Sequence, residues 1–177
     1  MHQLNPVPIV RPLVPAHVDL TNYTRWIKTS IIKHVERHRQ GVFLFIEGQT
    51  RKTQDQPRFM EVRIDGPNQR PCGTKGEWEF EVEIDILVST TLDEKDIYTL
   101  DRLLGIAAEA LNKEISVFRY GPKPGGNPAD SQNDSSYVGC LLLKPFPNGI
   151  RCNDFGQIEA TTKVIQGTVE ASYCMDI

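Results

Sequence analysis

The sequence contains few of the patterns that mark disulfide-bonded, metal-binding or membrane proteins. Its four cysteines form neither a Cys-x-x-Cys pair nor a group with a histidine at metal-ligand spacing. No segment approaches the ~20 consecutive apolar residues of a membrane helix, and residues 1–15 lack the charged and apolar regions of a signal peptide. We therefore expect free thiols, no membrane partner and an origin in the cytoplasm.

A large net charge is also missing. The formal net charge of the 177 residues is -3 at pH 7, which argues against a whole surface that grips nucleic acid. A chain of this length buries about two thirds of its unfolded surface, and its hydrophobic content is 39%. Because such a chain can form a core without a metal or a disulfide, we expect no cofactor.

The clearest pattern is the alternation of apolar and acidic residues over residues 78–88. Successive side chains of a strand point to opposite faces, so the apolar members share one face: Trp78, Phe80, Val82, Ile84, Ile86 and Val88. The other face carries what we call the acidic row: Glu79, Glu81, Glu83 and Asp85. The apolar face must pack against other elements, since each buried member contributes roughly 1.5–3 kcal/mol. The acidic row must face water, basic side chains or a solvent-filled space.

Two segments carry apolar residues at the spacing of an amphipathic helix. The first covers residues 20–40 and ends at Gly41, a residue type that commonly ends helices in a left-handed conformation. The second runs to about residue 111, and Thr91 with Glu94 has the capping-box spacing that would begin it. Gly105 inside this helix indicates close contact between the helix backbone and a sheet.

The remaining strands are predicted between turn residues. Residues 42–47 and 58–65 are expected to be strands on either side of an exposed hairpin loop at residues 48–57. The sequence Asp-Gly-Pro-Asn at residues 65–68 predicts a turn that leads into the acidic-row strand, with which 58–65 would pair antiparallel. Arg63 would then offset part of the acidic row. Further strands are expected at residues 115–120, 137–143, 157–163 and 165–177.

Two segments are rich in residues that break regular structure. Residues 1–18 interleave four prolines with apolar residues, which predicts an extended arm that packs on its own domain or on a neighbouring copy. A disordered leader is the alternative. Residues 121–136 have almost nothing to bury, so we expect a long flexible loop. The sequence thus predicts one α+β domain at residues 19–177, with a mostly antiparallel sheet and two helices packed on one of its faces.

The sequence gives only weak signals for a catalytic or metal site. His34 and His38 are four residues apart on a helix, a spacing that can hold zinc, but no third ligand is indicated and the flanking arginines disfavour a cation. The acidic row could supply carboxylates for magnesium in a nuclease. No lysine follows these residues on the same strand. We therefore expect no enzyme, and keep a magnesium-dependent nuclease as the alternative of a different class.

The order of elements resembles the tail-terminator, or tail-completion, proteins of long-tailed bacteriophages. The resemblance covers residues 20–177: a helix, a hairpin region with the alternating strand 78–88, a second helix, a short strand ending Arg119-Tyr120, a long polar loop and a closing strand. It implies a structural virion protein, assembled in the host cytoplasm, that forms a hexameric ring. That ring would end the tail tube and join it to the head connector, so the implied partners are the tail-tube protein and a connector or stopper protein. Another neck protein, such as a stopper or connector adaptor, is the alternative.

The resemblance also implies roles for charged and apolar residues. The acidic row would line the passage and repel DNA phosphates, so that genomic DNA slides through without specific binding. Basic residues would face acidic rims of neighbouring rings: Arg37, Arg39, Arg51 and Lys52. Apolar residues of the arm would contact neighbouring subunits: Ile9, Val10 and Leu13.

Overall fold

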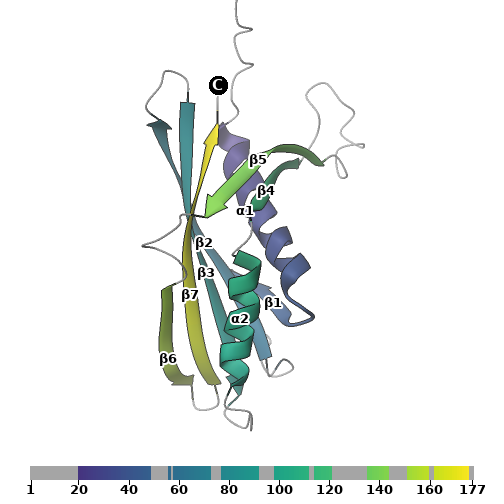
Figure 1. Ribbon diagram of the computed structural model, residues 1–177, viewed down its shortest axis with the longest axis vertical. Helices are drawn as coiled ribbons and strands as arrows, with labels where there is room; N and C mark the ends of the chain where they lie inside the picture. The colour runs from purple at the N-terminus through teal and green to yellow at the C-terminus, as the bar shows by residue number, and fades with distance from the viewer. Residues whose placement is uncertain are drawn as a thin grey trace, which may run out of the picture.

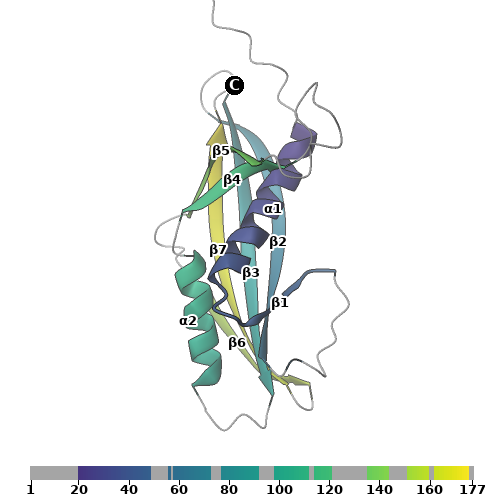
Figure 2. The same cartoon turned by 90° about the vertical axis from the view of Figure 1, so that its right-hand side faces the viewer.

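The fold joins two helices to an extended sheet. The computed structural model describes residues 20–48, 56, 58–72, 77–91, 98–111, 114–120, 135–143, 151–159 and 162–175. Its elements in chain order are α1 (Leu20–His38), β1 (Phe43–Ile46), β2 (Arg58–Cys72), β3 (Glu77–Thr91), α2 (Thr99–Leu111), β4 (Ile115–Tyr120), β5 (Ser135–Leu143), β6 (Arg151–Glu159) and β7 (Thr162–Met175). The predicted α+β class, with a mostly antiparallel sheet and both helices on one face, is confirmed (Figure 1, Figure 2).

The central strand is β3, which contains the alternating sequence. It pairs antiparallel with β2 from Arg58↔Thr90 to Cys72↔Glu77, and with β7 from Trp78↔Met175 to Thr91↔Thr162. Its inward side chains from Phe80 to Val88 are buried, at 3% exposure or less. This burial confirms the apolar face that the alternation predicted.

Both helices cover this apolar face. Ile27, Ile31 and Val35 of α1 are buried against the sheet, as are Leu103 and Leu111 of α2. In Figure 1 the two helices lie on the same side of the sheet, while the opposite side of β2, β3 and β7 has no helix over it. Within the described residues, neither helix has the length and apolar character needed to cross a membrane.

The beginning of the second helix differs from the prediction. Thr91 is the last residue of β3 and pairs with Thr162 of β7, so it does not cap a helix. The helix begins at Thr99, and the amide of Arg102 donates to the carbonyl of Tyr98 at 2.9 Å. Gly105 is exposed, and a Cβ placed on it would have no atom within 4 Å. The expected contact of Gly105 with the sheet is therefore wrong, because this residue lies on the solvent side of α2.

The predicted hairpin between the first two strands is also wrong. Within the described strands, β1 and β2 form the one parallel pair, with register Phe43↔Phe59 to Ile46↔Val62. A four-residue strand spans only ~13 Å, so the ten residues predicted as a hairpin loop suffice to bring the chain back to its starting end. The side chains of Phe45 and Phe59 meet edge to face, with ring centroids 5.1 Å apart. Residues 49–55 and 57 of the connection are outside the described residues.

The predicted turn at residues 65–68 is instead a bulge within β2. The pairing with β3 shifts register between Asp65 and Asn68 and then continues to Cys72. Gly66 has φ +92°, and a Cβ there would lie 2.8 Å from the carbonyl oxygen of Glu81 on β3. Glycine therefore allows the strand to bulge and remain paired, where the sequence suggested that it turned.

Two strands, β5 and β6, pair with the same edge of β7 at different places along it. The strand β6 pairs with residues 162–168 of β7, and β5 pairs with Ser172 and Ala171. The predicted strand at residues 157–163 is in fact the end of β6 and the start of β7, and Ser135 and Ser136 of the predicted loop belong to β5. Residues 121–134 of that loop and the arm at residues 1–18 are outside the described residues.

The outer edge of β4 is closed by α1. The amide of Phe118 donates to the hydroxyl of Ser30 at 2.9 Å, and Nε1 of Trp26 donates to the carbonyl of Tyr120 at 2.9 Å. Side chains of the helix thus satisfy backbone groups that an edge strand would otherwise expose. Figure 2 shows the β4 and β5 pair crossing beside the first half of α1.

The bulge gives the first testable prediction. Replacing Gly66 by alanine should lower the free energy of unfolding by about 1–3 kcal/mol, because the new Cβ meets a backbone oxygen at an unfavourable φ. Replacing Gly105 by alanine is the matched control and should raise it by about 0.5–1 kcal/mol, since the site is helical and open. Urea unfolding followed by circular dichroism measures both. Equal effects of the two substitutions would contradict the assigned bulge.

Candidate functional site: the acidic face of the sheet

The acidic row lies on the sheet face opposite to the one that the two described helices cover. Glu79, Glu81, Glu83 and Asp85 alternate with the buried residues of β3, and each is partly exposed. The strand geometry therefore places all four carboxylates on one surface. The structure adds side chains from β2, β6 and β7 that the sequence did not place there, and these change the charge of the surface.

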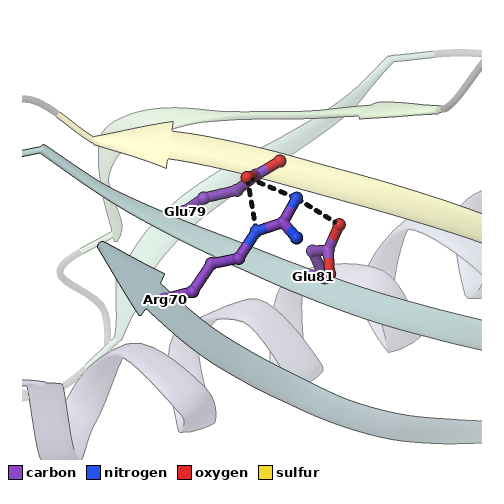
Figure 3. A network of polar contacts seen from close by, with 3 residues as sticks. All are labelled: Arg70, Glu79 and Glu81. Atoms are coloured by element: carbon purple, nitrogen blue, oxygen red, sulfur yellow. Dashed lines mark hydrogen bonds and ion pairs between the residues drawn. The ribbon is translucent and has the colours of Figure 1, made fainter. Parts of the chain in front are cut away.

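Arg70 of β2 bridges two members of the acidic row. Its Nε and Nη2 lie 2.8 Å from Oε2 of Glu79, and its Nη2 donates to Oε1 of Glu81 at 2.9 Å (Figure 3). Arg70 stands opposite Glu79 in the strand register. One guanidinium thus holds two carboxylates that would otherwise repel each other along the strand.

Arg151 brings a second positive charge from the edge of the sheet. This residue of β6 pairs in register with Thr168 of β7, and its side chain reaches across β7 to Glu83. The distance between Nη2 and Oε2 of Glu83 is 3.4 Å, and both side chains are about half exposed. This ion pair is therefore looser and better solvated than the one formed by Arg70.

Asp85 is held in place by two uncharged side chains of β7, which are linked to it by hydrogen bonds. The hydroxyl of Thr168, which is 5% exposed, donates to Oδ1 of Asp85. The side-chain amide of Gln166 donates to the same hydroxyl at 3.3 Å. These contacts fix the position of the Asp85 carboxylate without neutralising its charge.

The predicted partner of the acidic row, Arg63, makes a different contact. It stands opposite Asp85 in register, but its Nε donates to Oε1 of Glu61 on its own strand at 3.0 Å. Glu61 is 4% exposed and was not predicted as part of the site. Among the described side chains of this face, the carboxylates, which include Asp65, outnumber the three arginines. The face is therefore acid-rich and internally bridged, where the sequence had suggested a row of separate carboxylates.

Two of the four predicted basic contact residues lie at the end of α1, on the helix side of the sheet. Arg37 is exposed in the last turn of the helix. Arg39 follows the helix, and its Nη1 donates to the carbonyl of Val42 at 3.1 Å. The other predicted contact residues are outside the described residues: Arg51, Lys52, Ile9, Val10 and Leu13.

The two helical histidines pack against the backbone of both helices. A ring nitrogen of His34, Nε2, lies 2.9 Å from the carbonyl of Ala110 in α2, so this contact joins the two helices. Nδ1 of His38 lies 2.8 Å from the carbonyl of His34. Among the described residues, no group of three or more histidine, cysteine or acidic side chains is arranged to hold a metal ion.

The side chains of two of the four cysteines are described, and both are free thiols, as expected. These are Cys140 of β5 and Cys152 of β6. Burial raises the pKa of the Cys140 thiol, and a hydrogen bond with Glu114 raises it further. Cys140 is therefore a neutral thiol at physiological pH, without the lowered pKa that a nucleophilic cysteine needs.

The acidic row forms a line of negative charge in fixed positions along the sheet. Its carboxylates are bridged by arginines and do not converge on one point. No protein-family model and no curated protein matches the chain. The function must therefore be argued from the arrangement of the fold and the charges of its surfaces.

The Arg70 contacts give a testable prediction on stability. Replacing Arg70 by glutamine should lower the free energy of unfolding by about 0.5–1 kcal/mol at low salt, because Glu79 and Glu81 then repel each other. Most of this difference should vanish at about 1 M NaCl, where charges are screened beyond ~3 Å. Arg25, exposed on α1, is the control, and its replacement by glutamine should have a smaller effect. A loss that does not depend on salt would contradict the ionic role of Arg70.

Proposed function

We propose that the protein is a structural virion component that assembles into a ring at the end of a phage tail tube. In this role the ring, a homohexamer, ends tube growth and joins the tail to the head connector. The observation that carries the proposal is the division of the sheet into two faces. Both described helices cover one face, and the other has neither of them over it and is acid-rich along strands of 14 and 15 residues.

An acid-rich face without either described helix over it is suited to the wall of a passage for DNA. Phosphates are repelled by the excess of carboxylates, so DNA would slide along the surface without being held. Arg70 and Arg151 limit this repulsion and keep the carboxylates in fixed positions. Such a surface supports passage of the genome and gives no sequence-specific contact, since none of the described groups is arranged to read base edges.

The edges of the sheet support assembly with other copies. Residues 151–157 of β6 are exposed, and Phe155 is 49% exposed although it is aromatic. An edge strand with an exposed aromatic residue tends to pair with another chain unless something covers it. At the other end of the sheet, β1 is a second edge. We assign these two edges to contacts between neighbouring subunits of the ring.

The nuclease alternative receives less support from the same surface. A magnesium site needs carboxylates that converge on one point. Here Glu79 and Glu81 share a guanidinium, Glu83 contacts Arg151 and Asp85 accepts from Thr168. These partners occupy the carboxylates that a metal would need, which favours the structural role.

Oligomeric state is the direct test of the ring. Native mass spectrometry of the purified protein, alone and with tail-tube protein, should detect a ring of six copies. Replacing Phe155 by aspartate should abolish the ring and leave the melting temperature of the subunit unchanged, because this side chain is half exposed. A monomer in both mixtures would refute the proposal, and binding to the connector without the tube protein would assign the ring to another position in the neck.

The acidic face gives a separate prediction. Replacing Glu79, Glu81 and Glu83 by glutamine should make the protein retain duplex DNA at low salt, because Arg70 and Arg151 lose their acidic neighbours. The control carries the same charge change at exposed glutamates elsewhere: Glu36, Glu109 and Glu114. Gel-shift titration measures both. Equal DNA retention by the two variants would contradict the assigned face, and magnesium-dependent cleavage of the DNA by the unchanged protein would favour the nuclease.

A further inference from the structure

The outer face of the ribbon formed by β4 and β5 carries apolar side chains that remain exposed. On the inner face of this ribbon, Val117 and Leu141 are fully buried, whereas Tyr137 and Leu142 are each 59% exposed. The rings of Phe118 and Tyr137 meet edge to face across the two strands, with centroids 6.0 Å apart. A contiguous exposed apolar cluster of this kind marks a binding surface.

Cys140 belongs to the same surface. It lies two residues before Leu142 on β5 and therefore shares its face. Its thiol is hydrogen-bonded to the hydroxyl of Tyr137. We call these four side chains the ribbon patch: Phe118, Tyr137, Cys140 and Leu142. The patch shares no residue with the acidic row, so the proposed passage for DNA does not explain it.

The helix α1 begins beside the ribbon patch. Nε1 of Trp26 donates to the carbonyl of Tyr120, two residues after Phe118 on β4. Six residues separate Trp26 from Leu20, the first residue of α1, which is ~9 Å of helix. The chain that precedes α1 therefore joins the helix close to this end of the ribbon, as the position of α1 in Figure 2 shows.

The sequence before α1 is suited to an aromatic surface. Residues 6–15 read Pro-Val-Pro-Ile-Val-Arg-Pro-Leu-Val-Pro, and their four prolines favour the polyproline II helix, which has three residues per turn. Every third residue then shares one side, which here is wholly apolar: Pro6, Ile9, Pro12 and Pro15. Aromatic surfaces bind segments with the spacing of Pro12 and Pro15, because such segments are already extended before they bind.

The length of the connection allows this segment to reach the patch of its own chain. Residues 16–19 link Pro15 to Leu20, and five steps of extended chain span up to ~17 Å. The link between β4 and β5, residues 121–134, also leaves the ribbon at this end, but it contains no valine, leucine, isoleucine, methionine or aromatic residue. The apolar arm is therefore the better occupant of an apolar patch.

We propose that residues 6–15 dock on the ribbon patch of the same chain, with Pro12 and Pro15 against the rings of Phe118 and Tyr137. The docked arm covers the thiol of Cys140. This assigns the arm to its own domain, one of the two placements expected from the sequence. The contact does not depend on the proposed ring, because the arm and the patch belong to one chain.

The test measures how fast iodoacetamide alkylates Cys140 in the folded full chain, with peptide mass spectrometry to resolve each cysteine. Replacing both Pro12 and Pro15 by serine should raise this rate at least about threefold, because the released arm no longer covers the thiol. The rate at Cys152, which is exposed on β6, should not change. The matched control replaces Pro122 and Pro124 by serine and should leave the rate at Cys140 unchanged.

A rescue experiment separates docking from an indirect effect of the substitutions. An excess of a peptide of residues 4–16 should restore slow alkylation of Cys140 in the serine variant, and the same peptide carrying Pro12→Ser and Pro15→Ser should not. The proposal is overturned if the serine variant and the unchanged chain react equally fast, if the control variant reacts as fast as the serine variant, or if the peptide does not rescue. Protection of Cys140 that grows with protein concentration would also overturn it, in favour of an arm from a neighbouring copy.

Discussion

The pairing of β3 with both β2 and β7 is the constraint on which the rest of the structure depends. Because β3 is paired on both sides over nearly its whole length, its side chains can point only toward one sheet face or the other. Phe80, Ile84 and Ile86 are fully buried under the helices, and burial of each contributes roughly 1.5–3 kcal/mol. A shift of one residue in register would exchange the apolar and acidic sets. The position of the carboxylates is therefore fixed by the same packing that forms the core.

The acidic row is confined to one side of the sheet as a result. The acid-rich face lies on one side of the sheet, where arginines from β2 and β6 bridge its carboxylates. On the helix side, the end of α1, β1 and the start of α2 enclose a cavity that Arg39, Arg58 and Arg102 help to line. In the proposed ring, the acid-rich face is the surface that repels DNA.

The features that were predicted correctly from the sequence are those in which apolar residues recur at a regular spacing along the chain. The alternation in β3 and the helical spacing in α1 depend only on neighbouring residues, so both could be predicted correctly. The direction of β1 could not, because four apolar residues carry no information about parallel or antiparallel pairing. The partners of the acidic row were missed for a related reason, since Arg151 and Glu83 are 68 residues apart. Arg70 was missed because it opposes Glu79 only after the bulge at Gly66 shifts the register by one residue, and the sequence predicted a turn at that place.

The central claim is that the acid-rich face of β3 lines a passage in an assembled ring. An electron cryomicroscopy map of the protein assembled with tail-tube protein tests this claim most directly. The account predicts a ring in which Glu79, Glu81 and Glu83 line the central channel, with α1 and α2 on the outside. A map that places the helices along the channel, or that shows the acidic face packed against another protein with no channel beside it, would contradict the account.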